Sequence, residues 1–275
     1  MRVRTAPDPA SAAELAEFSE FLLQIGEGRY PVNSDISEND ICLPLYPGVG
    51  DDNLQDEYFV DRAILAPTNA SVRRINEMVA ERLTGETKEY LSVDSLEGVA
   101  DPNMFEQEFL NSLNFSGIPP HRIVLKVGTP IIMIRSNLNS DAGLCNEIRL
   151  RVVSLRERGI EATIMSGPFK GKTVFIPRII FYSEDDDKEF PFKLRRKQFP
   201  VVPAFAMTIN KAQGQSIHHV GIYLESPVFA HGQLYVALSR VTSRKAIKIA
   251  VDPSAIDENG NIHTKNIVYR EIFNL

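Results

Sequence analysis

The segment TINKAQGQS (208–216) brings polar and basic side chains together directly after the apolar run VVPAFAM. If that run is a strand of an open α/β sheet, the segment lies at the carboxyl edge of the sheet, where such sheets bind ligands. The residues that offer groups there are Thr208, Asn210, Lys211, Gln213 and Gly214. A hydroxyl, amides, an ammonium and an exposed backbone suit sequence-independent binding of a sugar-phosphate chain. An ordinary polar helix start would contain the same kinds of residue.

Charge is unevenly distributed along the chain. Residues 190–215 hold no acid and five bases, which are Lys193, Arg195, Arg196, Lys197 and Lys211, whereas residues 35–61 hold eight acids and no base. The net charge of −6 argues against a protein that coats DNA by bulk charge, but it is compatible with a local basic groove. A solvated surface is the alternative explanation of such runs.

The order of the apolar runs predicts an α/β fold. RAILAP begins a strand expected over 62–67, and Thr68 or Asn69 can cap the helix that follows. Further along, the compact apolar strands VVPAFAMT, HVGIYL and AIKIAV alternate with helical segments at 209–216 and 232–240. This alternation is typical of a parallel sheet.

The N-terminal region predicts one more helix of this domain, over residues 11–26. Ser11 and Glu14 form a capping box at its start, and apolar residues then recur at helical spacing. Gly26 is a plausible end for this helix.

Between residues 122 and 195 the pattern changes to β-branched runs separated by Gly, Asn and Asp. Short strands at this spacing predict a small antiparallel β-barrel inserted in the α/β domain. Within it, GPFKGKT (167–173) resembles a phosphate-binding loop, but its glycine spacing is wrong and a β-branched run follows. We therefore expect a turn between strands. The expected organisation is one α/β domain, formed by residues 1–121 and 196–275, with the barrel of 122–195 inside it.

Several classes of protein are disfavoured by composition. The two cysteines, Cys42 and Cys145, are far apart and form no CxxC motif, so neither a disulfide framework nor a zinc site is expected. The N-terminal residues lack the apolar run of a signal peptide, and no stretch approaches the roughly 20 apolar residues that span a membrane. The sequence thus predicts a reduced, intracellular protein without a membrane partner.

Two motifs resemble those that close superfamily-1 DNA helicases: TINKAQGQ and YVALSR (235–240). The surrounding stretches resemble the PIF-type, RecD-like branch of ATP-dependent DNA helicases, especially the copies carried by Helitron transposons. These stretches include DRAILAPTN, VGTPIIMIRSNLNSDAGLCN, FKLRRKQFPVVPAFAMTINKAQGQS, HGQLYVALSRV and NIVYREIF. The resemblance covers residues 61–275, and the opening MRV is similar to the N-M-R motif of the family.

The resemblance implies the second of two RecA-like motor domains, with ATP held between them. Arg240 and Arg2 would then reach the γ-phosphate, as a guanidinium stays charged and binds phosphate oxygens through two hydrogen bonds. A helix-end salt bridge is the alternative for Arg240, and a disordered terminus is the alternative for Arg2. Residues that would couple the nucleotide to DNA are Gln215, Tyr235 and Ser239.

Single-stranded DNA is the partner that the resemblance implies. Its contacts would come from Thr68, Asn69, Thr208, Asn210, Lys211, Gln213 and Gly214, with Lys193, Arg195 and Arg196 where the inserted barrel rejoins the motor. The family usually has Gly-Thr where this chain has Glu147-Ile148. Loss of the glycine is expected to alter the turn, and the carboxylate would repel a phosphate.

The nucleotide-binding parts of such a motor are not found in the sequence. No G-x-x-x-x-G-K-[ST] motif occurs, and no acidic pair follows an apolar strand as a magnesium-binding pair would. We therefore interpret the chain as the C-terminal half of a helicase that binds ATP and Mg²⁺ only together with a first motor domain. A non-enzymatic remnant that binds single-stranded DNA and a subunit that completes another protein's ATP site remain alternatives. Family membership implies a nuclear location and roles in DNA repair, recombination and telomere maintenance.

Overall fold

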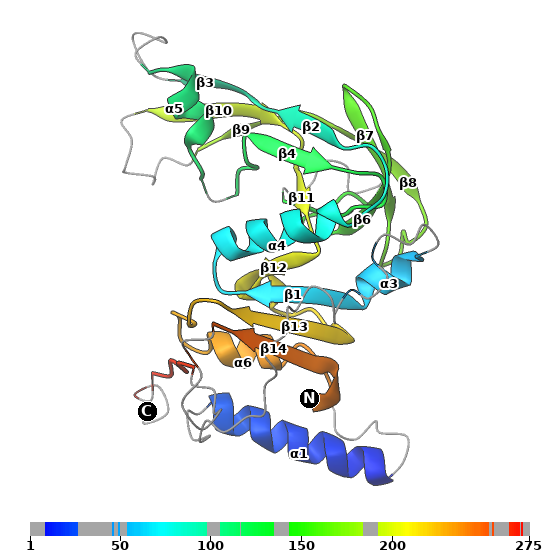
Figure 1. Ribbon diagram of the computed structural model, residues 1–275, viewed down its shortest axis with the longest axis vertical. Helices are drawn as coiled ribbons and strands as arrows, with labels where there is room; N and C mark the ends of the chain where they lie inside the picture. The colour runs from blue at the N-terminus through cyan, green and yellow to red at the C-terminus, as the bar shows by residue number, and fades with distance from the viewer. Residues whose placement is uncertain are drawn as a thin grey trace. The chain divides into compact units, whose positions relative to one another are not determined.

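The computed structural model describes residues 9–26, 46, 49, 54–97, 105–115, 117–134, 143–183, 192–252, 255, 264–269 and 271, without the side chains of residues 9–15 and 26. The chain forms two compact units. The first comprises residues 1–49, 57–79 and 205–275, and the second comprises residues 50–56 and 80–204. Figure 1 shows the elements of both units. The second unit is thus an insertion in the first, and the predicted domain boundaries at 122 and 195 stay a prediction.

The first unit contains a four-stranded parallel sheet. Its strands are β1 (Arg62–Ala66), β12 (Ala206–Thr208), β13 (His219–Leu224) and β14 (Ile247–Val251). Their order is β12-β1-β13-β14, and every neighbouring pair is parallel. The predicted α/β class with a parallel sheet is therefore confirmed, and the expected strand over 62–67 ends one residue earlier.

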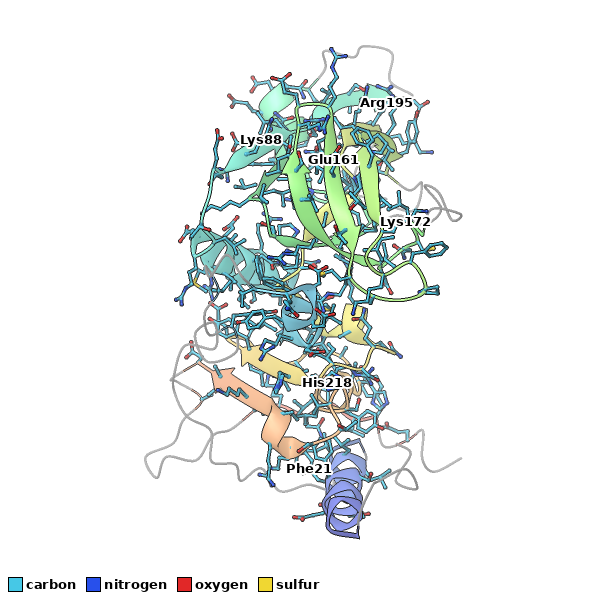
Figure 2. The ribbon with its side chains drawn as sticks, turned by 90° about the vertical axis from the view of Figure 1, so that its right-hand side faces the viewer. Phe21, Lys88, Glu161, Lys172, Arg195 and His218 are labelled. Atoms are coloured by element: carbon cyan, nitrogen blue, oxygen red, sulfur yellow. The ribbon has the colours of Figure 1, made fainter. Side chains whose placement is uncertain are left out.

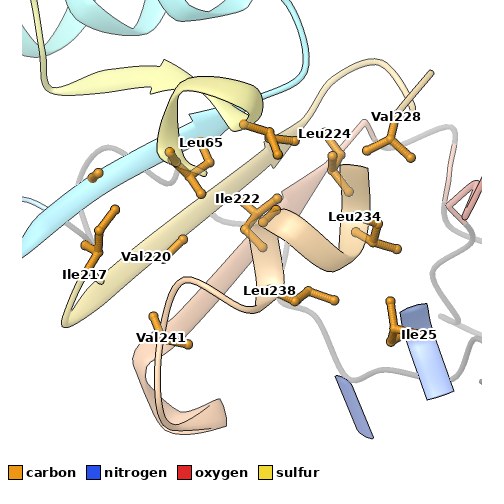
Figure 3. Close-up of a cluster of buried hydrophobic side chains, with 14 of the residues drawn as sticks. Ile25, Leu65, Ile217, Val220, Ile222, Leu224, Val228, Leu234, Leu238 and Val241 are labelled. Carbon is orange, nitrogen blue, oxygen red and sulfur yellow. The ribbon is translucent and has the colours of Figure 1, made fainter. Parts of the chain in front are cut away.

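Helices cover this sheet and close its core. They are α1 (Pro9–Gly26), α3 (Asp56–Val60), α4 (Asn69–Glu81) and α6 (Gln233–Leu238), with the short 3₁₀ helices η3 (Ile209–Ala212) and η4 (Arg244–Ala246). Figure 3 shows side chains of β13, such as Ile222, packed against Leu234 and Leu238 of α6, with Ile25 of α1 nearby. The predicted helix over 11–26 begins at Pro9, so Ser11 lies within its first turn and not at its cap.

The larger sheet of the second unit is antiparallel. It contains β5 (Pro130–Met133), β6 (Arg149–Leu155), β7 (Gly159–Ile164), β8 (Thr173–Pro177) and β11 (Val201–Pro203), in the order β11-β5-β6-β7-β8. Among the described residues β11 and β8 do not pair with each other, so the expected closed barrel is not found and the sheet is open. The turn at 167–173 joins β7 to β8, which confirms that GPFKGKT is not a phosphate loop.

Two smaller sheets complete the second unit. One has the order β3 (Val93–Glu97), β10 (Lys193–Gln198), β9 (Ile179–Tyr182), and the other pairs β2 (Lys88–Leu91) with β4 (Arg122–Leu125). The helix α5 (Gln107–Ser112) contributes Leu110 to a small apolar cluster with Leu194 of β10. The sequence had predicted no strand in the region of β2 and β3.

The run VVPAFAMT, expected to be one strand, is divided between the two units. Its first part is β11, which pairs with β5 in the antiparallel sheet, and its second part is β12 of the parallel sheet. Pro203 ends β11 because proline has no N–H to continue a ladder. Among the described residues, no helix is long and apolar enough to span a membrane.

Candidate nucleic-acid and nucleotide interface

Two of the predicted DNA-binding segments meet at the carboxyl edge of the parallel sheet. Strands β12 and β1 are neighbours, and Thr208 at the end of β12 lies directly opposite Ala66 at the end of β1. Thr68 follows the end of β1 as closely as Asn210 follows the end of β12, and Asn69 is the next residue after Thr68. The parallel direction of the strands therefore brings these residues, far apart in the sequence, to one edge.

The segment that follows β12 presents its polar side chains to solvent. The helix η3 buries Ile209 and Ala212, and it leaves Asn210 and Lys211 exposed. Gln213 and Gly214 are exposed as well, and Gly214 has a φ of +82°, a conformation that glycine adopts without strain. The apolar residues thus anchor the segment while the predicted DNA-binding groups stay accessible.

Thr68 caps helix α4. Its Oγ1 accepts a hydrogen bond from the Ser71 N–H at 3.2 Å and lies 3.0 Å from the Ser71 hydroxyl oxygen. The Ser71 hydroxyl in turn donates to Oε2 of Glu225 at 3.3 Å. Glu225 is the residue that follows β13. Asn69, the first residue of α4, is exposed. The start of α4 is therefore ordered by side-chain hydrogen bonds.

A carboxylate that the sequence had not indicated also lies at this edge. Glu225 forms an ion pair with Arg74 of α4 at 2.5 Å, and Arg74 also donates to the Tyr223 hydroxyl at 2.7 Å. The hydrogen bond to Glu225 and the charge of Tyr223 raise the pKa of Arg74. Arg74 thus offsets the negative charge that Glu225 would otherwise present to a phosphate.

Arg240 is half-buried, and its guanidinium donates hydrogen bonds to neighbouring backbone carbonyl groups. Nε donates to Val236 O at 2.8 Å, and Nη1 donates to Ala212 O at 3.2 Å and to Gln215 O at 3.1 Å. Nη2 donates to the Ser239 hydroxyl at 2.7 Å. Burial lowers the pKa of Arg240, although the charge of Tyr235 opposes this effect. In this structure the residue joins the end of α6 to the segment at 208–216.

The three residues predicted to couple the nucleotide to DNA, and the second predicted arginine, have different surroundings. Gln215 is partly buried and donates from Nε2 to Lys211 O at 3.2 Å. Tyr235 is exposed on α6, and the Ser239 hydroxyl donates to Val236 O at 3.1 Å. Arg2 lies outside the described residues. Arg240 thus lies between Ser239, to which it donates, and the segment 208–216, where it donates to the carbonyl oxygens of Ala212 and Gln215.

The prediction that Arg196 contacts DNA is wrong. Its side chain is fully buried and forms a two-pronged ion pair with Asp94, with Nε–Oδ1 2.9 Å and Nη2–Oδ2 2.7 Å. It also donates to the backbone oxygens of Leu110, Leu113 and Pro119. A guanidinium enclosed in this way cannot contact a phosphate. Lys193 and Arg195 alternate with it on β10 and are partly exposed in the second unit.

The sequence also did not indicate the role of Asn76. This buried residue of α4 donates from Nδ2 to Ala206 O at 3.1 Å and accepts from Ala206 N at 2.8 Å. Among the described strands β12 lies at the edge of its sheet, so the outward backbone groups of Ala206 pair with the Asn76 amide and not with another of these strands. The one signal in the sequence for this role was a polar residue next to Ile75, on the apolar face of the predicted helix.

The glutamate that departs from the family pattern occupies a turn. Glu147 has a φ of +62° and is the one non-glycine residue with positive φ in the described part of the chain. Its N–H donates to Met133 O, and the Met133 N–H donates to Ile148 O. Glu147 and Ile148 therefore both lie opposite Met133 on the neighbouring strand. This pairing is that of a β-bulge whose first residue is normally glycine. Glu147 therefore has a left-handed backbone conformation that glycine adopts more readily, and the change of the turn relative to the family stays a prediction.

Comparison with known proteins shows relatives over most of the chain. A family model described as DNA helicase Pif1, 2B domain, matches residues 108–155, and one described as helicase, of the herpes type, matches residues 184–270. The ATP-dependent DNA helicase PIF1 of Emericella nidulans is 28% identical over an alignment of 259 residues that covers 74% of this chain and 33% of that protein. The PIF1 helicase of Xenopus laevis is 30% identical over 186 residues, 67% of this chain and 27% of that protein. This chain is a homologue of the Pif1 helicases.

Solved structures of Pif1 helicases share the fold. The crystal structure of Pif1 from Candida albicans has a TM-score of 0.63 at 22% identity, covering 94% of this chain and 56% of that one. A Bacteroides Pif1 in complex with ADP-AlF3 and single-stranded DNA has a TM-score of 0.59 at 21% identity, covering 98% and 53%. Among the relatives, the Campylobacter jejuni Pif1 is 27% identical over 72% of this chain and 43% of its own length. The chain thus matches less than half the length of the three Pif1 relatives compared by sequence, and little more than half of the two Pif1 chains of solved structure.

Proposed function

We propose that this chain is the C-terminal half of an ATP-dependent DNA helicase, a second RecA-like motor domain that binds and translocates on single-stranded DNA. The observation that supports the proposal most directly is the exposed segment after β12, which lies at the same sheet edge as Thr68 and Asn69, in a homologue of Pif1. Asn210 and Lys211 contact phosphates there, with Thr208, Gln213 and the backbone at Gly214. The Bacteroides relative is described in complex with single-stranded DNA, which agrees with this ligand.

Arg240 is proposed to act at the ATP site, which a first motor domain completes with its phosphate loop and Mg²⁺. Its bonds to Ala212 O and Gln215 O support a coupling role, because any movement of the guanidinium toward a γ-phosphate alters the DNA-contact segment. An arginine that stabilises transition-state charge is worth about 10³–10⁵ in rate in such enzymes. Arg2 is proposed as a second arginine at the same phosphate, and the nucleus as the location of the whole protein.

Binding of single-stranded DNA by the purified chain tests the DNA site. Lys211→Ala removes one phosphate contact and is expected to weaken binding. It also reduces the slope of log affinity against log salt by about 0.7, the value for one phosphate on a single strand. Lys248→Ala removes an equal charge from β14 of the same sheet, and it is the matched control. Equal slopes for the two variants would exclude the segment after β12 as a phosphate site.

ATP hydrolysis tests the nucleotide role. The chain alone is expected to show no turnover, and addition of a Pif1 first motor domain as a separate polypeptide is expected to give DNA-dependent turnover. Arg240→Lys keeps the charge but not the planar set of donors, so it should abolish this turnover. Turnover by the chain alone would contradict the interpretation as half of a motor, and undiminished turnover by Arg240→Lys would remove Arg240 from the mechanism.

A further inference from the structure

A carboxylate shares the carboxyl edge of the parallel sheet with the residues proposed to contact DNA. Thr208 ends β12, Thr68 follows β1 and Glu225 follows β13, and these three strands lie side by side in Figure 1. Neighbouring strands are about 4.8 Å apart, so β13 lies about 10 Å from β12, on the other side of β1. Glu225 is therefore close enough to this edge to influence a DNA strand that binds there.

Arg74 of α4 uses one of its three side-chain nitrogens at this edge. Nη2 lies 2.5 Å from Glu225 Oε2 and donates to the Tyr223 hydroxyl at 2.7 Å. The guanidinium carbon also lies 5.8 Å from the centre of the Tyr223 ring. Nε and Nη1 have no hydrogen-bond partner among the described residues. The guanidinium therefore keeps donors for a further anion, and Tyr223 holds it independently of Glu225.

Glu225 occupies groups of the kind that bind a phosphate. Its Oε2 accepts from the Ser71 hydroxyl at 3.3 Å as well as from Arg74, and the Ser71 hydroxyl oxygen lies 3.0 Å from Thr68 Oγ1. A carboxylate and a phosphodiester each carry one negative charge, and both accept hydrogen bonds from hydroxyl and guanidinium groups. The Glu225 carboxylate thus has the charge and the partners of a phosphate, directly beside Thr68.

The ion pair between Arg74 and Glu225 is exposed enough to exchange its anion. The side chains of Arg74 and Glu225 are 49% and 36% exposed. An ion pair of this exposure contributes little to stability, because water screens the charges and two long side chains have to be ordered. A phosphodiester offers two oxygens, which a guanidinium binds through two parallel hydrogen bonds. Replacement of the carboxylate by a phosphate is therefore favourable for Arg74.

We propose that Glu225 is an internal competitor of the DNA phosphate, and that Arg74 is a DNA-binding residue that Glu225 occupies until a strand binds. The inference rests on the proposed function, from which it takes its ligand, and it adds the regulation of that site. The apparent dissociation constant for DNA then equals the intrinsic one divided by the fraction of molecules in which Arg74 has left Glu225. A motor that translocates has to release each phosphate as well as bind it, and a competing carboxylate favours that release.

Anisotropy of a fluorescent oligo-dT with the full chain at low salt tests the competition. Glu225→Gln keeps the shape of the side chain and removes its charge, and it is expected to tighten binding about 1.5- to 5-fold, the equivalent of one exposed ion pair. Asp61→Asn removes an equal charge at the amino edge of the same sheet and is the matched control. Asp61 Oδ1 lies 3.8 Å from His218 Nε2, and Figure 2 shows His218 beside the start of β13. Equal tightening by both variants would mean that net charge alone acts, and it would overturn the proposal.

Arg74→Ala in the Glu225→Gln background separates competition from simple neutralisation. If Arg74 binds a phosphate, its loss in this background weakens binding and reduces the slope of log affinity against log salt by about 0.7, the value for one phosphate on a single strand. If Arg74 serves only to neutralise Glu225, no carboxylate is left to neutralise, and its loss has the same small effect as Lys248→Ala in that background. The second result would refute Arg74 as a DNA-binding residue.

The competition and the proposed motor site can fail independently. If Lys211→Ala weakens binding while Arg74→Ala in the Glu225→Gln background matches Lys248→Ala, the competition is refuted and the motor site stands. If the Arg74 variant weakens binding and Lys211→Ala does not, the roles of Arg74 and Glu225 stand and the segment after β12 is excluded as a phosphate site. If neither variant weakens binding, both proposals are refuted.

Discussion

The backbone at position 147 has a conformation that glutamate seldom adopts. With a φ of +62°, Glu147 fills the first position of a β-bulge, where a residue with a Cβ is strained by about 1–2 kcal/mol. The hydrogen bonds on both sides, from Glu147 N to Met133 O and from Met133 N to Ile148 O, hold it there. The surrounding sheet therefore imposes the glycine geometry in the absence of glycine.

Glu147→Gly is accordingly expected to stabilise the protein. Relief of the strain exceeds the extra entropy that glycine gives to the unfolded chain, which leaves a net gain of about 0.5–1 kcal/mol. Chemical denaturation measures the change. Glu157→Gly, at an exposed turn residue whose φ is not positive, is the control and should be destabilising or neutral. Equal effects at both positions would show that the conformation at 147 is not strained.

A second prediction concerns the buried ion pair between Arg196 and Asp94. Arg196→Met removes the guanidinium that pairs with the buried Asp94 carboxylate, leaves the Ser92 hydroxyl as its donor, and is expected to cost about 3–5 kcal/mol of unfolding free energy. Arg196→Met/Asp94→Leu removes both charges and should recover a large part of that loss, although the carbonyl oxygens of Leu110, Leu113 and Pro119 still lack donors. A double variant as unstable as the single one would mean that the ion pair itself contributes little.

The elements of the parallel sheet could be predicted because each strand is a compact apolar run followed by a polar turn. Strands β2 and β3 could not, since KEYL and VDSLE are short and contain charged residues whose partners, β4 and β10, come later in the chain. Among the candidate site residues, the exposure of Lys211 could be predicted from the segment TINKAQGQS. Burial of Arg196 did not, because only the pairing of β10 with β3 brings Asp94 to it.

Asn76 connects helix α4 to β12, the strand that precedes the proposed DNA-binding segment 208–216. Asn76→Ala leaves the Ala206 N–H and C=O without partners, and each unsatisfied buried group costs about 1–3 kcal/mol. Hydrogen exchange at the amides of β12 is expected to accelerate, and affinity for single-stranded DNA to fall with it. Glu77→Ala, at an exposed position on the same helix, is the control. Unchanged exchange in Asn76→Ala would show that the pairing of β12 with β1 holds the strand without the Asn76 amide.

At the scale of the whole molecule, the two compact units have separate apolar cores, one between the parallel sheet and its helices and one within the antiparallel sheet. Two unfolding transitions are therefore expected in calorimetry, as for other proteins with more than one domain. Asn76→Ala should lower the midpoint temperature of the transition of the first unit, and Arg196→Met should lower that of the second unit. A single transition that both variants shift together would show that the units unfold as one.

The insertion also has a consequence for synthesis on the ribosome. Strand β1 is central in its sheet, yet both of its neighbours, β12 and β13, come after the inserted unit. About 140 residues separate Ala66 from Ala206, and translation at about 5–20 residues per second takes roughly 7–28 s to produce them. During that interval the nascent chain carries the apolar strand RAILA with no partner to pair with. A chaperone that binds extended apolar segments would find its target in this window, well before the sheet can close.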